Sequence, residues 1–363
     1  MTMPKIAITL SLLALAGCAT AFAADLPEYR PGQPVSGEIR SWGNDHMAAL
    51  LRRWQQGFRR YHPDVRFTDS LKGTASAQWG LQARAADLAL MGREIWPYEQ
   101  YGTYRRSYNF AVGVAVATGS YDVIGKSPAH VVFVHKGNPI ASLSVEQLDR
   151  IFGAERTGGW RVLDWVIEGV ARDASSNIRT WGQLGLKGAW ANKPIVPYGP
   201  PSLVTGALSF FQTHVSGGAD TRNENLREYE DRRAMLQALA QDRYGIAYAA
   251  ASYANPAVKA IAIAAGSSNN FVSPSRATVQ DRSYPLTRTA YIYFTIDTET
   301  GDVANPPVDP KIKEFLRYVL SREGQQDVVG EGDYLPLTPV LANEQWALVE
   351  HPPTGRVFRK DRR

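Results

Sequence analysis

The order of apolar segments along this chain is the feature that most restricts its fold. A short strand is expected at residues 37–41, followed by an amphipathic helix at 47–61 whose apolar residues recur mostly every three or four positions. Residues 65–67 and 86–91 indicate two more strands, with a second helix between them. Because strand, helix and strand in this order form a crossover between parallel strands, we expect an α/β protein with helices on both faces of a sheet.

The second half of the chain continues this alternation. The segments that read as further strands are 130–135, 245–248, 258–264 and 289–296. Ser144 and Gln147 form a capping box, which predicts a helix continuing to Phe152. Asp309 and Pro310 open another helix, since proline fits the first helical position. A chain of 363 residues is too long for one ordinary core, so we expect two domains.

The N-terminus has the composition of a signal peptide, because a lysine precedes an apolar run over 6–16 that is too short to span a bilayer. Two cleavage sites remain open. The sequence LAGC ending at Cys18 is similar to a bacterial lipobox, which predicts removal of 1–17 and lipidation of the cysteine. The sequence AFA further on fits ordinary cleavage and removal of 1–23. Either product is exported, and a lipid is its only expected link to a membrane.

Composition argues against several other functions. The formal net charge is +5 and the basic clusters are short, including the one in the tail 346–363, so we expect no nucleic-acid binding. Cys18 is the only cysteine, which leaves no disulfide or thiol chemistry. The six histidines lack metal-ligand spacing, and the sequence contains neither a G-x-S-x-G motif nor a P-loop. We therefore expect no catalysis, no metal and no cofactor.

Several stretches together resemble one protein family. They are GNDHMAALLRRWQQGF (43–58), ADLALMGREI (86–95), NPIASLSVEQLDRIF (138–152), IRTWGQLGLKGAWANKPIVPYG (178–199), YPLTRTAYIY (284–293) and FLRYVLSREGQQDVV with GDYLPL (315–337). In this order they are similar to the periplasmic phosphate-binding proteins of phosphate ABC transporters, which have the type II periplasmic-binding-protein fold. The resemblance runs from about residue 37 to 336, most of the mature chain.

The resemblance implies two α/β lobes with mixed sheets and a ligand cleft between the lobes. Lobe 1 is expected to hold 34–125 and 286–345, and lobe 2 to hold 130–285, with 346–363 as a basic tail. It further implies a monomer that binds phosphate or a related anion and works with an ABC permease. Its expected location is the periplasm, with lipid anchoring or secretion as the alternatives. In this family, loops at helix N-termini hold the anion through backbone N–H groups, hydroxyls and usually an arginine.

The first of these loops corresponds to Asn44, Asp45 and His46. The family has a threonine where this chain has His46. A neutral histidine still donates one hydrogen bond, and a protonated one adds charge. The alternative is an ordinary helix cap followed by a surface histidine.

The second and third loops correspond to Thr74, Ala75 and Ser76, and to Arg93. In the second loop two hydroxyls remain and an alanine replaces another, so a plain helix N-cap is the alternative to anion binding. In the third, a glycine replaces the family serine before Arg93. This arginine follows a strand, at the sheet edge where α/β proteins usually bind ligands. It is expected either to contact the ligand or to pair with Glu94 or with a carboxylate across the cleft.

The fourth loop, YGPPSLVTGALSFF, departs most from the family. When its phenylalanine pair 210–211 is matched to the family's aromatic pair, Thr205 and Gly206 fall on the first two residues of the family's Ser-Gly-Thr motif. Ala207 replaces the last hydroxyl, and Pro200 replaces the arginine. A hydrogen bond to a charged group contributes about 1.5–3 kcal/mol. Losing these donors therefore removes about 5 kcal/mol, or roughly three to four orders of magnitude in affinity.

Two functions remain open from the sequence. The first is an exported binding protein for phosphate or a related anion, serving ABC-type uptake or sensing. The alternative is a secreted or lipid-anchored phosphate-binding-like protein with a degenerate ligand site, acting through a protein partner. The missing arginine favours the alternative, whereas the retained loops favour the first.

Overall fold

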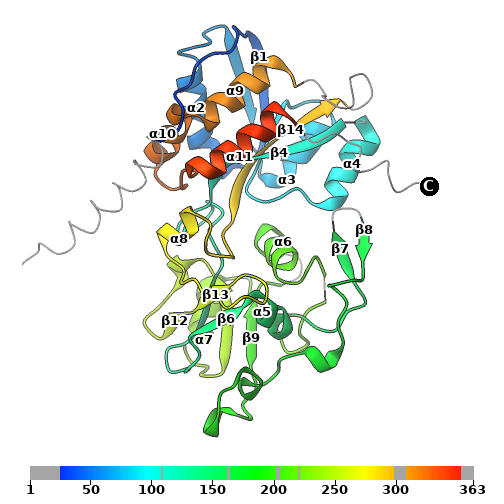
Figure 1. Cartoon of the computed structure of the whole chain (residues 1–363), viewed down its shortest axis with the longest axis vertical. Helices are drawn as coiled ribbons and strands as arrows, with labels where there is room; N and C mark the ends of the chain where they lie inside the picture. Colours follow the sequence, from blue (N-terminus) through cyan, green and yellow to red (C-terminus); the bar gives the residue numbers. More distant parts are fainter. Residues whose placement is uncertain are drawn as a thin grey trace, which may run out of the picture. The chain divides into compact units, whose positions relative to one another are not determined.

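The computed structural model describes residues 25–107, 109–161, 164–201, 205–219, 221–297 and 308–352 (Figure 1). The predicted signal peptide with Cys18 lies outside these residues. The chain divides into two compact units: unit 1 extends to Thr118 and resumes at Thr289, and unit 2 is Gly119–Arg288. Among the described residues, none of the helices has the length and apolar content needed to cross a membrane.

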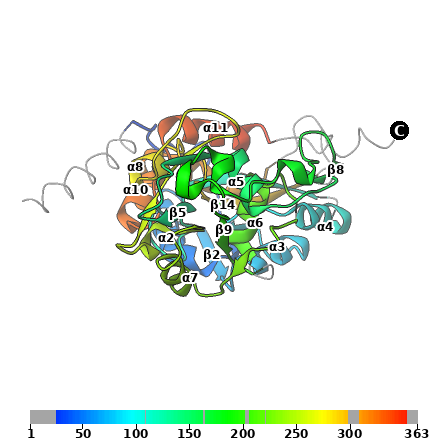
Figure 2. The ribbon, with the colours of Figure 1, turned by 90° about the horizontal axis from the view of Figure 1, so that it is seen from below.

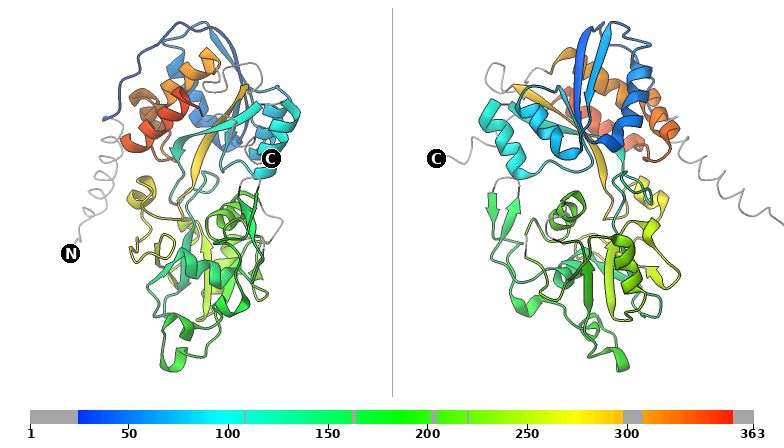
Figure 3. Two further views of the ribbon diagram at one scale, coloured as in Figure 1. Left: turned by 45° about the vertical axis from the view of Figure 1, so that its right-hand side comes forward. Right: turned by 180° about the vertical axis from the view of Figure 1, so that it is seen from behind.

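The sheet of unit 1 is mixed. Its strands, in spatial order, are β2 (Val65–Ser70), β1 (Gly37–Gly43), β3 (Leu88–Met91), β14 (Thr289–Asp297) and β4 (Asn109–Thr118). β1 is parallel to both neighbours, and Figure 3 shows β1 and β2 side by side in blue. β14 is antiparallel to β3 and to β4. The parallel pairing expected from the early segments is confirmed for β1 to β3, and the late strand β14 adds the antiparallel part.

Both faces of this sheet are buried. The helices of unit 1 are α2 (Ala48–Phe58), α3 (Thr74–Gln82), α4 (Pro97–Ser107), α9 (Pro310–Leu320), α10 (Arg322–Glu331) and α11 (Pro339–Glu350). Along β3, Leu88 and Leu90 belong to the core that α2 and α9 complete, while Ala89 and Met91 pack with apolar residues of α3. Alternate residues of a strand point to opposite faces, so β3 requires cover on both sides. The expected α/β fold with helices on both faces is confirmed here.

The ends of the helices follow the expected signals. Asp309 accepts a hydrogen bond from the backbone N–H of Lys311, and Pro310 occupies the first turn of α9, as predicted. α3 and α4 lie next to each other (Figure 2). The predicted tail 346–363 begins inside α11, and its residues 353–363 lie outside the described part of the chain.

Unit 2 has a second mixed sheet. Its strands, in spatial order, are β10 (Arg227–Glu228), β9 (Val196–Gly199), β11 (Gly245–Ala249), β5 (Val131–His135) and β12 (Val258–Ala260). β10, β9 and β11 are parallel, whereas β5 is antiparallel to β11 and β12. The helices are α5 (Val145–Phe152), α6 (Thr205–His214), α7 (Arg232–Leu239) and α8 (Arg276–Gln280). Apolar residues of β5, β9, β11 and α7 form a core on this sheet.

One predicted strand is wrong. Residues 258–264 form two strands, not one, because the chain changes sheets at Ile261. The N–H of Ile261 still donates to the carbonyl of Val132 on β5, but the next residues, β13 (Ala262–Ala264), pair with β6 (Ser142–Ser144). An apolar run cannot report this change, since both strands are apolar. The capping box of Ser144 and Gln147 at the start of α5 is confirmed.

Short elements complete the described chain. They are the hairpin β7 (Gly159–Arg161) and β8 (Asp164–Val166) and the 3₁₀ turns η1 (Asp45–Met47), η2 (Ala174–Ser176), η3 (Trp181–Leu184), η4 (Gly188–Trp190) and η5 (Ala251–Tyr253).

Candidate functional site

In unit 1, two parallel strands end at the same edge of the sheet and approach each other closely. β1 ends at Gly43, which is paired with Leu90 of β3. The N–H of Asn44 donates to the carbonyl of Leu90 at 2.9 Å. A side chain at Gly43 would place its Cβ 2.2 Å from that carbonyl oxygen, and φ is +131°. Glycine is therefore required here, and the loops after β1 and β3 lie beside each other.

The first predicted loop forms the start of η1. Asn44 is buried, and its side-chain oxygen accepts a hydrogen bond from the N–H of His46 at 3.0 Å. Asp45 and His46 are exposed. The structure therefore shows a helix cap followed by an exposed histidine side chain, in which one backbone donor of the loop is already used by Asn44.

The second predicted loop is helical from Thr74 onward, so its prediction as a loop before the helix is wrong. The glycine at position 73 precedes α3 and contributes no side-chain cap. The N–H groups of Thr74 and Ala75 begin the helix and have no acceptor one turn earlier. The hydroxyl of Ser76 donates to the carbonyl of Gly73 at 2.8 Å, and the hydroxyl oxygen of Thr74 lies 3.5 Å from the N–H of Gly92. This last contact joins the second loop to the third.

Arg93, in the third loop, pairs with Glu99 of α4. Two hydrogen bonds of 2.8 Å join the guanidinium to the carboxylate, and a third reaches the carbonyl of Glu94 at 2.9 Å. Its Cζ lies 3.7 Å from the ring centroid of Trp96, and both partners of the ion pair are buried. The carboxylate of Glu94 instead accepts from the hydroxyl of Tyr291. The partner of Arg93 is thus a carboxylate six residues on, which the sequence did not single out.

In unit 2, β9 ends at Gly199, and the fourth predicted loop starts at Pro200. α6 begins at Thr205, so Thr205 and Gly206 form its first turn. Both rings of the phenylalanine pair used to match this loop are buried, and Phe211 stacks on Tyr248 of β11 with centroids 3.9 Å apart. The aromatic pair thus fixes the helix that the fourth loop opens.

Two arginines at this edge of unit 2 were missed by sequence reasoning. Arg222 donates to the carbonyl of Pro200 at 2.7 Å, and Arg232 donates to the carbonyls of Tyr229 and Glu230. The N–H of Tyr229 in turn donates to the carbonyl of Gly199. One signal was available for Arg232. It is the first residue of α7, where a cation interacts unfavourably with the helix dipole. An arginine at this position therefore indicates a role other than helix stabilisation.

The sequence model of the PBP superfamily domain matches residues 29–323. The chain is 33% identical over 336 residues to the phosphate-binding protein PstS of Pseudomonas aeruginosa, covering 90% of this chain and 93% of the relative. The chain belongs to the PstS-like phosphate-binding proteins. The resemblance noted from the sequence is thereby confirmed. Protein SphX of Synechococcus elongatus is a more distant relative, 26% identical over 63% of this chain and 60% of its own length.

Solved structures of PstS-like proteins share the fold at low sequence identity. PstS from Borrelia burgdorferi aligns with a TM-score of 0.54 and 14% identity, covering 84% of this chain and all of the other. An ABC-type phosphate transport receptor from Vibrio cholerae aligns with a TM-score of 0.51 and 16% identity, covering 82% of this chain and 99% of the other. At such identities the match supports the fold alone.

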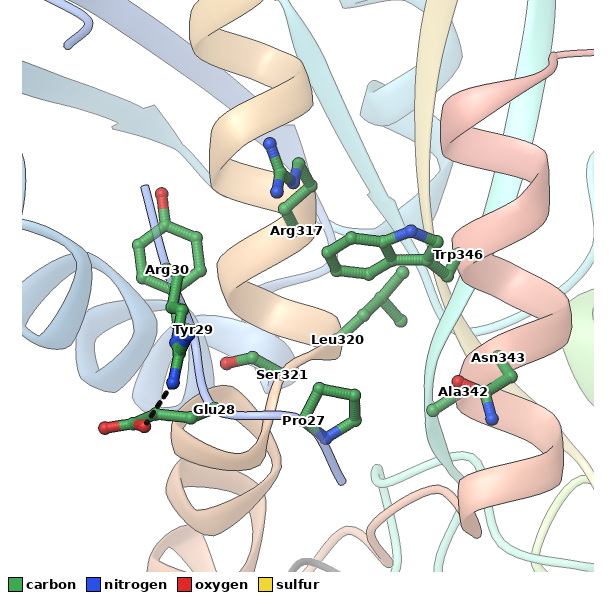
Figure 4. A pocket seen from close by; sticks show the side chains of 10 residues that line it. All are labelled: Pro27, Glu28, Tyr29, Arg30, Arg317, Leu320, Ser321, Ala342, Asn343 and Trp346. Atoms are coloured by element: carbon green, nitrogen blue, oxygen red, sulfur yellow. Dashed lines mark ion pairs between the residues drawn. The ribbon is translucent and has the colours of Figure 1, made fainter. Parts of the chain in front are cut away.

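This PstS-like chain also has a cavity of about 340 Å³ in unit 1, away from the predicted loops. Figure 4 shows the segment 27–30, α9 and α11 around it, with Pro27, Leu320 and Trp346 among the lining side chains. Its arginines have carboxylate partners, Glu28 for Arg30 and Glu314 for Arg317. None of the residues predicted to bind an anion lines this cavity.

The described residues contain no group of three or more histidine, cysteine, aspartate or glutamate side chains placed to hold a metal ion. The structure brings three of the four predicted loops together, those containing Asn44, Thr74 and Arg93, at one edge of the unit 1 sheet. The loop leading to Thr205 belongs to unit 2.

Proposed function

We propose that the protein binds phosphate or a related tetrahedral oxyanion as a monomer outside the cytoplasm and delivers it to an ABC permease for uptake or sensing. The observation that carries this proposal is the 33% identity, over 90% of the chain, to a protein named for phosphate binding. No part of the proposed role is catalytic.

The geometry of unit 1 supports anion binding at the start of α3. A helix N-terminus presents oriented N–H groups and a favourable dipole to an anion. The N–H groups of Thr74 and Ala75 are not satisfied by a cap, because residue 73 is a glycine. The hydroxyl of Thr74 and the N–H of Gly92 lie within reach of each other, so both are close to this helix start. We assign Asn44, Asp45 and His46 to the rim of this site in unit 1, and we propose Thr205 and Gly206, at the start of α6, as anion-binding residues of unit 2.

Arg93 has a different place in this proposal. Its guanidinium is already bound to Glu99, so its positive charge is compensated within unit 1. We assign Arg93 to holding the loop after β3 in the shape that presents Gly92, and only through this loop to the ligand. The alternative role is a direct contact between the ligand and the remaining N–H donors of Arg93. Mutagenesis of the ligand site has to distinguish this role from loop positioning.

Export follows from the predicted signal peptide. Removal of residues 1–23 gives a periplasmic or secreted protein, and processing before Cys18 gives a lipid-anchored one. The segment that follows is held in unit 1, since Leu26 and Tyr29 are buried.

Isothermal titration calorimetry of the mature chain tests the function against phosphate, sulfate, an organophosphate and a dicarboxylate. We expect phosphate or a close analogue to bind with a Kd of about 1 mM or tighter, and to raise the melting temperature. Thr74→Val should weaken binding roughly tenfold or more, since it removes a hydroxyl from a charged ligand. Thr68→Val, an exposed threonine of the same unit, is the matched control. If no anion binds or changes the melting temperature, the proposed function is wrong.

A further inference from the structure

The carboxyl edge of the unit 2 sheet gathers two arginines with different electrostatic surroundings. Arg222 donates to the carbonyl of Pro200, and its Nη2 also pairs with the carboxylate of Glu228. Arg232 follows β10 along the chain and bonds only to backbone carbonyls, through Nη1. Among the described residues, it forms no ion pair with any carboxylate. In this part of the chain no carboxylate therefore pairs directly with Arg232, although the charge of its neighbour Asp231 acts on it.

A cation without a direct ion pair is unfavourable at this position. Arg232 is half-buried, and burial lowers its pKa from the usual value. It is also the first residue of α7, where the helix dipole disfavours a cation. Arg233, its neighbour on the same helix, is exposed and loses little hydration. A counter-charge from outside the chain would remove the penalty at Arg232.

The Tyr248 hydroxyl lies at the same place. A Cβ on Gly199 would be 3.7 Å from this hydroxyl oxygen, so the phenol reaches the end of β9, one residue before Pro200. The guanidinium of Arg232 donates to the carbonyl of Tyr229, whose own N–H donates to Gly199, and the guanidinium of Arg222 donates to the carbonyl of Pro200. Burial raises the pKa of Tyr248, and the charges of Arg232 and Arg222 act in the opposite direction. The hydroxyl has no hydrogen-bond partner among the described residues. Two guanidinium groups and one hydroxyl thus gather where the fourth loop begins.

We propose that Arg232 is an anion-binding residue of unit 2, assisted by the Tyr248 hydroxyl and by Arg222, and that these groups replace the donors missing at Pro200 and Ala207. The inference rests on the proposed function and deepens it. Its ligand is a tetrahedral oxyanion, since the guanidinium of Arg232 supplies a positive charge and both guanidinium groups have planar sets of N–H donors that suit anionic oxygens. Proline at position 200 is then compatible with phosphate binding, because the cation comes from another segment.

The experiment compares Arg232→Gln with Arg233→Gln, which remove the same charge from adjacent positions of one helix. Calorimetry with inorganic phosphate at low ionic strength should show a Kd weakened roughly ten- to hundredfold in R232Q. R233Q should stay within about twofold, because an exposed charge is screened by solvent. Equal weakening in both variants would overturn the proposal, since it would reflect net charge alone. Unchanged binding in R232Q would overturn it as well.

Further variants separate ligand binding from a structural role. Without phosphate, R232Q should melt at or above the temperature of the wild-type protein, because an uncompensated charge is removed, but phosphate should no longer raise its melting temperature. Tyr248→Phe should weaken binding severalfold, and Arg232→Lys should retain part of it. Glu228→Gln should strengthen binding by freeing Arg222. If R232Q fails to fold, wild-type affinity in both Y248F and R232K overturns the assignment. If the wild-type protein binds no anion, the proposed function itself is wrong. If it binds phosphate and these substitutions leave the affinity unchanged, only this inference is wrong.

Discussion

At the scale of single residues, the chain keeps its positive charges in two distinct states. Arg93 is buried and forms an ion pair with Glu99, whereas Arg232 is half-buried and donates hydrogen bonds to backbone carbonyls. A buried ion pair contributes little net stability compared with apolar residues, but breaking it leaves an uncompensated charge. The same kind of side chain therefore fixes a loop in unit 1 and is available to a ligand in unit 2.

The Arg93–Glu99 pair gives a prediction for stability. Arg93→Met should lower the free energy of unfolding by about 3–5 kcal/mol, because Glu99 remains buried without its partner. Urea unfolding of the mature protein without phosphate measures this. Arg40→Met is the matched control, because the Arg40–Asp87 pair is more exposed and should cost only about 0–1 kcal/mol. Adding Glu99→Leu to Arg93→Met should recover part of the loss, and a double variant as unstable as the sum of the singles would contradict the buried-pair interpretation.

Sequence patterns predicted the interactions of side chains whose partners are close in the sequence. They did not predict interactions with partners on other elements. The capping box of Ser144 and Gln147 was readable because both partners lie within one turn. The role proposed for Arg232 was not readable, because it depends on Tyr248 and Gly199 of other strands, and the link to Gly199 runs through Tyr229. For Arg93 the sequence indicated a position at the sheet edge where ligands usually bind but not the partner Glu99, since α4 has no strong periodicity to show which face is inside.

At the scale of elements, the alternation of strands and helices predicted most of the fold, and the failures have a common cause. Apolar runs mark where strands lie but not which sheet they join, so the break at Ile261 between β12 and β13 was hidden. The start of α3 was placed too late, because Gly73, Thr74 and Ser76 have lower helix propensity than alanine and made the segment resemble a loop. In the structure, packing of Ala77 and Leu81 on the sheet outweighs this weak propensity.

One connection between elements predicts a pH dependence of stability. His62 follows α2, and its Nε2 lies 2.7 Å from the hydroxyl of Tyr29, which donates to Glu314 of α9 at 2.8 Å. Burial lowers the pKa of His62 below its ordinary value of 6.5, although the charge of Glu314 opposes this. In the window between the two pKa values the unfolded chain binds more protons than the folded one. Stability should therefore fall as the pH decreases from about 6.5 through the folded pKa.

Urea unfolding between pH 8 and pH 5 measures this dependence. His62→Gln should flatten the decline while changing stability at pH 8 only slightly, because a glutamine amide still donates to Tyr29. Part of the decline should remain, since burial also lowers the pKa of His130. His135→Gln, a substitution on a part-buried histidine of β5, is the control. A decline in H62Q as steep as in the wild-type protein would show that His62 does not carry the effect.

At the scale of the whole molecule, segments from the two ends of the described chain meet in unit 1. The backbone N–H of Tyr29 donates to Glu323 at 2.7 Å, and the N–H of Arg322 donates to the carbonyl of Pro27 at 2.9 Å. The sequence could not show this closure, because residues 24–35 read as a proline-rich leader without periodicity. The family resemblance predicted a return of the chain to the first lobe, but not that the leader is part of its core.

Removing this leader should destabilise unit 1 selectively. A mature chain lacking residues 24–32 loses the buried Leu26 and Tyr29. Loss of a buried aromatic residue such as Tyr29 alone lowers the free energy of unfolding by about 3–5 kcal/mol. Hydrogen exchange followed by mass spectrometry should show lost protection in α9 and α10, which the leader contacts, while β9 and β11 of unit 2 keep theirs. Tyr29→Phe is the milder companion variant: it retains the ring packing and leaves Glu314 without one donor, so it should cost about 1–3 kcal/mol. Equal loss of protection in β11 and α9 would contradict a local role for the leader in closing unit 1.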